Sequence, residues 1–118
     1  MIKNNINFSI AIDGSSASGK TTASKFLSKK FKFKLLSSGK LYRYMALKII
    51  ENNYKYNNHF IKSQSKRITL DKLKNKRLYS LKVTKLSSII AKKKYVRKYL
   101  KEFQVIFIKK NKKVIIEG

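Results

Sequence analysis

The chain has no cysteine, no proline, only four glycines and only five acidic residues among its 118 positions. The absence of cysteine excludes a disulfide framework, a thiolate metal site and a cysteine nucleophile. No apolar run approaches the roughly 20 residues that are needed to span a bilayer. The first residues lead into a strand-like pattern rather than an apolar signal region, so the cytoplasm is the expected compartment.

Lysine is the residue that the chain has in excess. Lys and Arg number 30 against five acids, the formal net charge is +25, and 26 of the 30 basic residues are lysines. These lysines are scattered, and Lys, Asn and Ile together fill 49 of the 118 positions. Nucleic-acid-binding proteins usually focus their charge on one face and favour arginine. A general bias of the composition toward Lys, Ile and Asn explains the excess of lysine at least as well. A basic nucleic-acid-binding module stays open as an alternative function.

The apolar pattern predicts an α/β fold with a parallel sheet. The length allows one domain, and a hydrophobic content of 42% suffices for a core. Residues 53–75 are weakly patterned, so a loop or short mobile helices are expected there. Strands are predicted at 7–13, 33–36 and 114–116, and helices at 19–31, 40–52, 81–91 and 95–108. This alternating order of strands and helices is the pattern of α/β proteins.

A phosphate-binding loop is the strongest local signal. Gly14–Thr21 fits the pattern G-x-x-x-x-G-K-[ST] between a predicted strand and a predicted helix. Its backbone N–H groups can close around a polyphosphate, and the start of the helix adds roughly half a positive charge. Lys20 is placed to reach the outer phosphates and the Thr21 hydroxyl to ligate Mg²⁺, while Thr22 can bond a further phosphate oxygen. A serine-rich turn that matches by chance is the alternative.

A second group of residues follows the second predicted strand. Ligands in open α/β sheets collect at the carboxyl ends of strands, so residues 38–43 should border the same cleft as the phosphate loop. Arg43 could bind a phosphate in the forked geometry that lysine cannot match. A role for Ser38 as a helix N-cap, and an exposed Arg43, would account for these residues without a ligand. The chain places one of its four arginines here, which favours a functional role.

Three further positions are weaker candidates. Ser88 sits inside a predicted helix and is expected to face a polar cavity, with an exposed helical serine as the alternative, and Arg97 follows on the next helix. Glu117 ends an apolar strand, a pattern that often places a carboxylate near the Mg²⁺ of a phosphate-loop protein. His59, in the polar stretch, has no expected role.

Four blocks of the sequence together resemble the bacterial cytidylate kinase family, nucleoside monophosphate kinases that phosphorylate CMP and dCMP with ATP. They are residues 10–22, 36–43, 83–97 and 114–118. The resemblance implies a P-loop nucleoside monophosphate kinase fold over 1–118, with 37–100 as the monophosphate-binding region. It also implies a monomer that binds small nucleotides and has no specific nucleic-acid or membrane partner.

Roles for particular residues come with that resemblance. Lys20 and Arg43 would be catalytic, and Thr21 would hold Mg²⁺. The residues implied to bind ATP are Gly14, Ser15, Ser16, Ala17, Ser18, Gly19, Lys20, Thr21 and Thr22. The residues implied to bind CMP are Ser38, Tyr42, Arg43, Ser88 and Arg97, with the arginines on the phosphate and Ser88 near the cytosine ring.

The sequence also departs from the family pattern. Ser15 and Ala17 stand where the family usually has proline and often glycine, and Ser37 stands where it usually has aspartate. The resemblance covers only the first half of the enzyme, so a fragment is expected that lacks lid arginines; such arginines can be worth about 10³–10⁵ in rate. A three-stranded sheet would be marginal alone. A kinase with another acceptor, such as shikimate or another nucleotide, and a degenerate remnant that binds nothing stay open.

Overall fold

The computed structural model describes residues 8–12, 29–30 and 32–118. These residues fall into two compact units. One unit combines the described part of Met1–Gly39 with Val105–Gly118, and the other is Lys40–Gln104. The first unit contains the sheet, and the second contains most of the helical residues.

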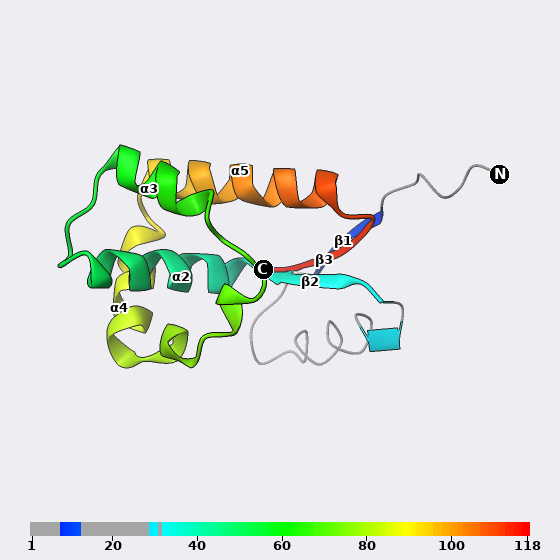
Figure 1. Ribbon diagram of the computed structural model, residues 1–118, viewed down its shortest axis with the longest axis horizontal. Helices are drawn as coiled ribbons and strands as arrows, with labels where there is room; N and C mark the ends of the chain where they lie inside the picture. The colour runs from blue at the N-terminus through cyan, green and yellow to red at the C-terminus, as the bar shows by residue number, and fades with distance from the viewer. Residues whose placement is uncertain (1–7, 13–28, 31) are drawn as a thin grey trace. The chain divides into compact units, whose positions relative to one another are not determined.

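The sheet has three parallel strands, which confirms the predicted α/β pattern. Strand β1 is Phe8–Ile12, β2 is Lys34–Ser37 and β3 is Lys113–Glu117, in the spatial order β1-β3-β2 (Figure 1). The central strand carries Val114 and Ile115, which are fully buried. A short, continuous apolar run is what a central parallel strand requires, because both of its faces are covered.

The register of the sheet brings the three strand ends to one level. Ile12 of β1 and Ser37 of β2 both lie opposite Glu117 of β3. At the other end, the Lys34 Nζ donates to the Asn111 Oδ1 at 2.7 Å, and the Asn111 Nδ2 donates to the Phe107 carbonyl at 2.8 Å. The turn at residue 111 is therefore fixed both to β2 and to the last turn of the preceding helix.

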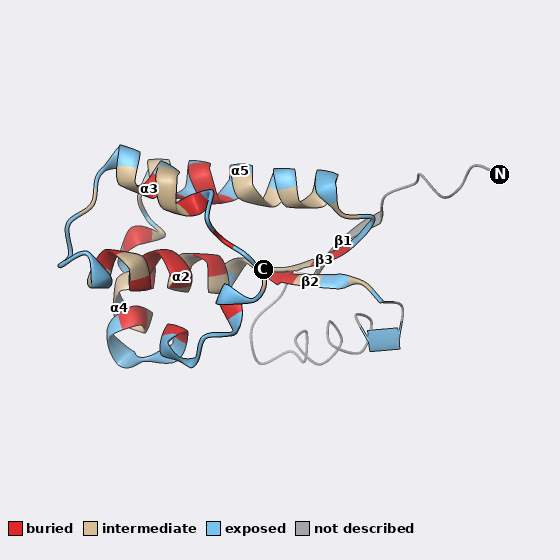
Figure 2. Ribbon diagram, in the orientation of Figure 1, coloured by how far each residue is buried: buried red, intermediate tan, exposed pale blue. Residues whose placement is uncertain are grey.

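The second unit is built around one buried helix. Helix α2 is Ser38–Glu51, and in Figure 1 it runs between α3 and α5 on one side and α4 on the other. Buried residues occur on most sides of this helix, as the red segments of Figure 2 show. They are Leu41, Tyr44, Met45, Ala46, Leu47 and Ile49. A helix with apolar residues over most of its circumference is a core helix rather than an amphipathic surface helix.

The surrounding helices agree with the predicted ranges to within two residues. Helix α4 is Leu81–Ile90, predicted at 81–91, and α5 is Lys94–Lys110, predicted at 95–108. Of the helix predicted at 19–31, the structure describes Lys29 and Lys30, which are helical.

The polar stretch after α2 forms short helices, one of the two outcomes expected for it. Helix α3 is Asn58–Ser65, followed by the 3-10 helices η3 at Lys72–Lys74 and η4 at Lys76–Tyr79. The Asn57 side chain caps α3 by accepting from the Phe60 N–H at 2.8 Å. The Tyr99 hydroxyl donates to the Asn58 Oδ1 at 2.6 Å, which ties α3 to α5. Caps and a few buried side chains hold this segment where apolar periodicity is too weak to predict a helix. The buried residues are Ile61 and Ser65 of α3, Leu73 of η3 and Leu78 of η4.

Helix α5 has buried residues only in its first half. Val96, Tyr99 and Leu100 are buried, whereas Ile106 is 50% exposed. No helix within the described ranges is both long and apolar enough to cross a membrane.

Candidate functional site

The carboxyl edge of the sheet gathers several of the candidate residues. Ser37 and Glu117 end neighbouring strands in register, and Ser38 opens α2 directly afterwards. The Ser38 Oγ lies 3.8 Å from the position that a Cβ on Gly118 would take. The predicted phosphate loop, residues 14–22, lies outside the described residues. The strand that leads into it, β1, ends at this same edge.

Glu117 is the acidic residue at this edge. Its Oε2 is buried and has no hydrogen-bond partner within the described part of the chain. A buried carboxylate oxygen without a donor is costly unless a cation or a bound water completes it. Carboxylate oxygens are also the ligands that Mg²⁺ prefers. The state of this oxygen therefore fits a magnesium ion, or one of its waters, at the carboxyl edge.

Arg43 is held in place on one side of its guanidinium. Its Nη1 donates to the Thr84 Oγ1 at 2.8 Å and to the Leu78 carbonyl at 3.1 Å. The guanidinium also lies 4.5 Å from the centroid of the Tyr79 ring, within the range of a cation–π contact. Both hydrogen bonds use Nη1, so Nε and Nη2 donate to no acceptor within the described ranges. This free edge carries two parallel N–H groups, the geometry that binds phosphate oxygens in pairs.

Thr84 positions Arg43, and the sequence reasoning assigned it no role. Its hydroxyl donates to the Ser80 carbonyl at 2.9 Å, so its oxygen is left to accept from the Arg43 Nη1. Ser80 is in turn the N-cap of α4 and accepts from the Val83 N–H at 3.3 Å. One signal was available, because Thr84 stands one helical turn before Ser88 on the same predicted helix.

Tyr42 and Arg97, from α2 and α5, are close enough to interact electrostatically. Burial raises the pKa of the half-buried Tyr42 phenol above its ordinary value of 10.0, and the positive charge of Arg97 opposes this rise without cancelling it. The phenol is therefore protonated near neutral pH and can donate a hydrogen bond. Arg97 itself is exposed.

Ser88 is exposed rather than enclosed in a polar cavity. Its Oγ donates to the Thr84 carbonyl at 3.4 Å, near the outer limit for a hydrogen bond, while the neighbouring Ser87 is buried and bonds the same carbonyl at 2.8 Å. Successive residues on a helix are about 100° apart, so the two serines lie on different sides of α4. The alternative, an exposed helical serine, therefore describes Ser88 in this structure.

Most of the predicted monophosphate residues lie in one unit of the structure. Tyr42, Arg43, Ser88 and Arg97 all belong to the unit 40–104, while Ser38 belongs to the sheet unit. Thr84 links two of them, since Arg43 bonds its hydroxyl and Ser88 its carbonyl. Within the described residues, no group of three or more His, Asp and Glu side chains could hold a metal ion.

Comparisons with known proteins agree with this arrangement. The family model described as Cytidylate kinase matches residues 10–118. The chain is 34% identical to the cytidylate kinase of Fusobacterium nucleatum, covering 95% of this chain and 56% of that protein. It is 33% identical to the cytidylate kinase of Mycoplasmopsis agalactiae, covering 99% of this chain and 58% of that protein. A shorter match to the cytidylate kinase of Borrelia duttonii is 48% identical over 61 residues, which is 52% of this chain and 27% of that protein.

The family model and the first two relatives match nearly the whole chain. The chain spans somewhat more than half the length of the first two of these relatives. The family match includes the end of β1, which leads into the predicted phosphate loop, and the whole unit that holds Arg43, Thr84 and Arg97. The chain belongs to the cytidylate kinase family.

Proposed function

We propose that this protein is a cytidylate kinase chain that acts in the cytoplasm in pyrimidine nucleotide metabolism. The reaction transfers the γ-phosphoryl group of ATP to the 5′-phosphate of CMP or dCMP and yields ADP with CDP or dCDP. The observation that carries the proposal is the Nε–Nη2 edge of Arg43, which has no acceptor among the described residues and forms a fork for phosphate on the first helix after β2. Membership of the cytidylate kinase family supports the choice of acceptor.

The acceptor nucleotide binds in the region 37–100, and Arg43 holds its phosphate. Tyr42 donates a hydrogen bond from its protonated phenol, and Arg97 adds a second positive charge beside it. Ser38 contacts the nucleotide from the start of α2, and Ser88 lies near the cytosine ring. The phosphate is thereby fixed in orientation before the transfer, which supplies much of the acceleration in phosphoryl transfer.

ATP is held by residues 14–22, whose backbone amides surround its phosphates, with Lys20 on the outer phosphates. Mg²⁺, when bound, neutralises charge on the transferring group. The residues that would hold it are Thr21, through its hydroxyl, and Glu117, through the oxygen that has no donor among the described residues. Positive charge from Lys20 and Arg43 offsets the negative charge that the two nucleotides bring together.

The test is CMP binding by calorimetry with two arginine variants. Arg43→Lys keeps the charge but removes the fork, so CMP affinity should fall about tenfold or more. Arg67→Lys is the matched control, because Arg67 is exposed after α3 and has no role in this proposal. Equal CMP affinity in the two variants would overturn the proposal. In the same titrations AMP, UMP and shikimate should bind more weakly than CMP, and a preference for one of them would assign a different acceptor.

A second candidate function is favoured by one specific observation, a lysine-rich hollow in the sheet unit. It has a volume of about 350 Å³ and is lined by Lys32, Lys34, Lys110, Asn111, Lys112 and Lys113. Five ammonium groups around one hollow suit a polyanion such as a nucleic-acid backbone. This function requires steeply salt-dependent binding of DNA or RNA that ATP does not displace.

A further inference from the structure

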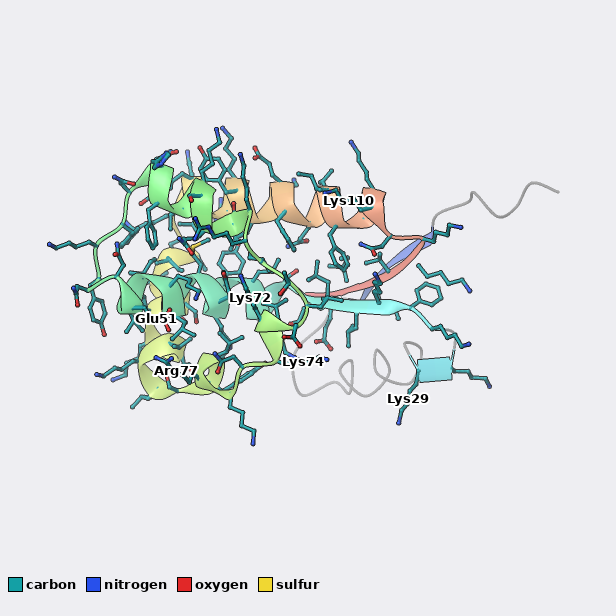
Figure 3. All side chains as sticks on the ribbon, in the orientation of Figure 1. Lys29, Glu51, Lys72, Lys74, Arg77 and Lys110 are labelled. Carbon is teal, nitrogen blue, oxygen red and sulfur yellow. The ribbon has the colours of Figure 1, made fainter. Side chains whose placement is uncertain are left out.

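A second hollow lies in the helical unit. None of the residues that line it is among those proposed to bind CMP or ATP. It has a volume of about 430 Å³ and is lined by Tyr44, Leu47, Lys48, Asp71, Lys72, Lys74 and Asn75. Figure 3 labels Lys72 and Lys74, which come from η3, together with Glu51 at the end of α2. Because residues on a helix turn by about 100° each, Tyr44 and Lys48 lie on a different side of α2 from Tyr42.

The charge of the lining suits a small dianion. Three ammonium groups and one carboxylate surround the hollow. Lys48 is paired with Glu51 at 3.2 Å, and the Lys72 Nζ donates to the Arg67 carbonyl at 2.9 Å. An ammonium group has three donors, so both lysines keep donors for a ligand. The Lys74 Nζ has no acceptor within the described part of the chain, so all three donors of this ammonium group are available.

Tyr44 provides an observation that lysine content alone does not explain. Its side chain borders the hollow and is 2% exposed, and its hydroxyl is buried with no hydrogen-bond partner among the described residues. Leaving such a group unpaired costs about 1–3 kcal/mol. Burial raises the pKa of this phenol, so it is a neutral donor near pH 7. A ligand oxygen that accepts a hydrogen bond from this hydroxyl would supply the missing partner.

Asn75 and Asp71 complete the chemistry of the lining. The Asn75 Oδ1 accepts from the Arg77 N–H at 2.9 Å, which orients the amide, and the Nδ2 group can donate to a ligand. Asp71 offers acceptor oxygens, which suit a ligand that also carries a hydroxyl group. Donors therefore outnumber acceptors around the hollow, and both charge and hydrogen bonding exclude a cation or an apolar ligand.

We propose that this hollow is a second anion site that binds a phosphate dianion, either free phosphate or the phosphate group of a small monoester, through Lys48, Lys72, Lys74 and the Tyr44 hydroxyl. A phosphate monoester is largely a dianion near neutral pH, because its second pKa is about 6. The site is separate from the one proposed for CMP and does not depend on it.

The first experiment is a titration of the full 118-residue chain at constant ionic strength, followed by ¹H–¹⁵N spectra. Inorganic phosphate and ribose 5-phosphate are the two probes. Saturable shifts at the amides of residues 44 and 72–75, with a Kd on the order of 1 mM for the better probe, are expected. Tighter binding of ribose 5-phosphate identifies a monoester as the ligand, and tighter binding of inorganic phosphate identifies the free ion. Linear, unsaturated shifts with both probes would overturn the site.

A charge-matched pair of double variants separates the site from general attraction to a basic protein. Lys72→Met with Lys74→Met should weaken phosphate binding about tenfold or more. Lys82→Met with Lys101→Met removes the same charge from exposed positions on α4 and α5 and should change the Kd less than about twofold. Equal losses in the two variants would show that net charge alone binds the ion, and the proposal would be wrong.

Tyr44→Phe provides a test that a merely structural tyrosine would not pass. Phe keeps the buried ring and removes only the unpartnered hydroxyl, so the melting temperature should stay the same or rise, while phosphate affinity falls about three- to tenfold. A lower melting temperature, or an unchanged affinity, would contradict the proposal.

Arg43→Met distinguishes this site from the proposed function. This variant should lose CMP binding and keep the phosphate shifts at residues 72–75. Loss of those shifts would mean that phosphate had occupied the CMP site, and the second site would be rejected while the kinase proposal stood. The reverse result, in which CMP binding survives Arg43→Met and the shifts at 72–75 remain, would reject the kinase proposal and keep the second site.

Discussion

Arg43 and Arg97 have the same proposed partner, a nucleotide phosphate, but the two side chains are held in place to very different degrees. Arg43 is half-buried and fixed by two hydrogen bonds and an aromatic ring. Arg97 is exposed, and its interaction with Tyr42 is electrostatic. A side chain that is already ordered loses little entropy when a ligand binds, whereas a free arginine loses up to about 2 kcal/mol. The fixed arginine should therefore contribute more to affinity than the exposed one.

The largest effect is expected from removing the fixed arginine. Arg43→Met deletes a pair of charge-assisted hydrogen bonds, so CMP affinity measured by calorimetry should fall about 100-fold. A loss smaller than that caused by Arg97→Met would reverse the comparison.

An intermediate effect is expected from removing the hydroxyl that orients Arg43. Thr84→Val keeps the shape of the side chain but takes away the acceptor of the Arg43 Nη1, so CMP affinity should fall about three- to tenfold. Thr84→Ser keeps the hydroxyl and is the matched control, with affinity close to that of the parent chain. If both variants bind like the parent, Arg43 does not need this contact.

A smaller effect is expected at the exposed arginine. Arg97→Met should lower CMP affinity about two- to fivefold, because exposed ion pairs contribute at most about 1 kcal/mol. The effect should shrink as salt is raised, whereas the loss in Arg43→Met should change less with salt. A salt-independent loss in Arg97→Met would show that Arg97 becomes enclosed when the nucleotide binds.

The smallest effect concerns Tyr42 and appears only at alkaline pH. Burial raises the pKa of its phenol above 10.0 in the folded state, so the unfolded chain loses this proton first as the pH rises. The stability that depends on this phenol is complete below about pH 10 and is lost as the pH rises through the folded pKa. Tyr42→Phe should therefore lose less free energy of unfolding than the parent chain between pH 9 and 11, measured by urea denaturation. If the free energy of unfolding changes with pH equally in the variant and the parent chain, the burial assigned to Tyr42 is wrong.

The sequence predicted the elements well where one apolar pattern decides the structure. Val114 and Ile115 mark a central strand, and the helix ranges after residue 80 hold to within two residues. The sequence was a weaker guide to which side chains are buried, because burial depends on segments that are distant along the chain. The burial of Tyr44 and Met45 on a second side of α2 follows from helices that cover it from two directions, which the pattern of α2 alone does not specify.

The candidate site shows the same division between local and distant information. Residue types and their spacing identified Arg43 and Arg97 as candidates, because each stands in a pattern that can be read along the chain. The Leu78 carbonyl and the Thr84 hydroxyl, 35 and 41 residues from Arg43, fix its orientation, and no local pattern indicates them. The exposure of Ser88 likewise depends on which of two neighbouring serines faces the core.

The strand order also has a consequence for how this chain folds during synthesis. Both β1 and β2 pair only with β3 among the described strands, and β1 at residues 8–12 meets its partner at 113–117. Strand β1 can therefore acquire this neighbour only after about a hundred further residues have left the ribosome. The contacts within 40–104 are closer along the chain and can form earlier, since loop closure over short separations is faster. The pairing of β3 with its two neighbours thus completes the sheet edge at which β1, the strand before the predicted phosphate loop, ends.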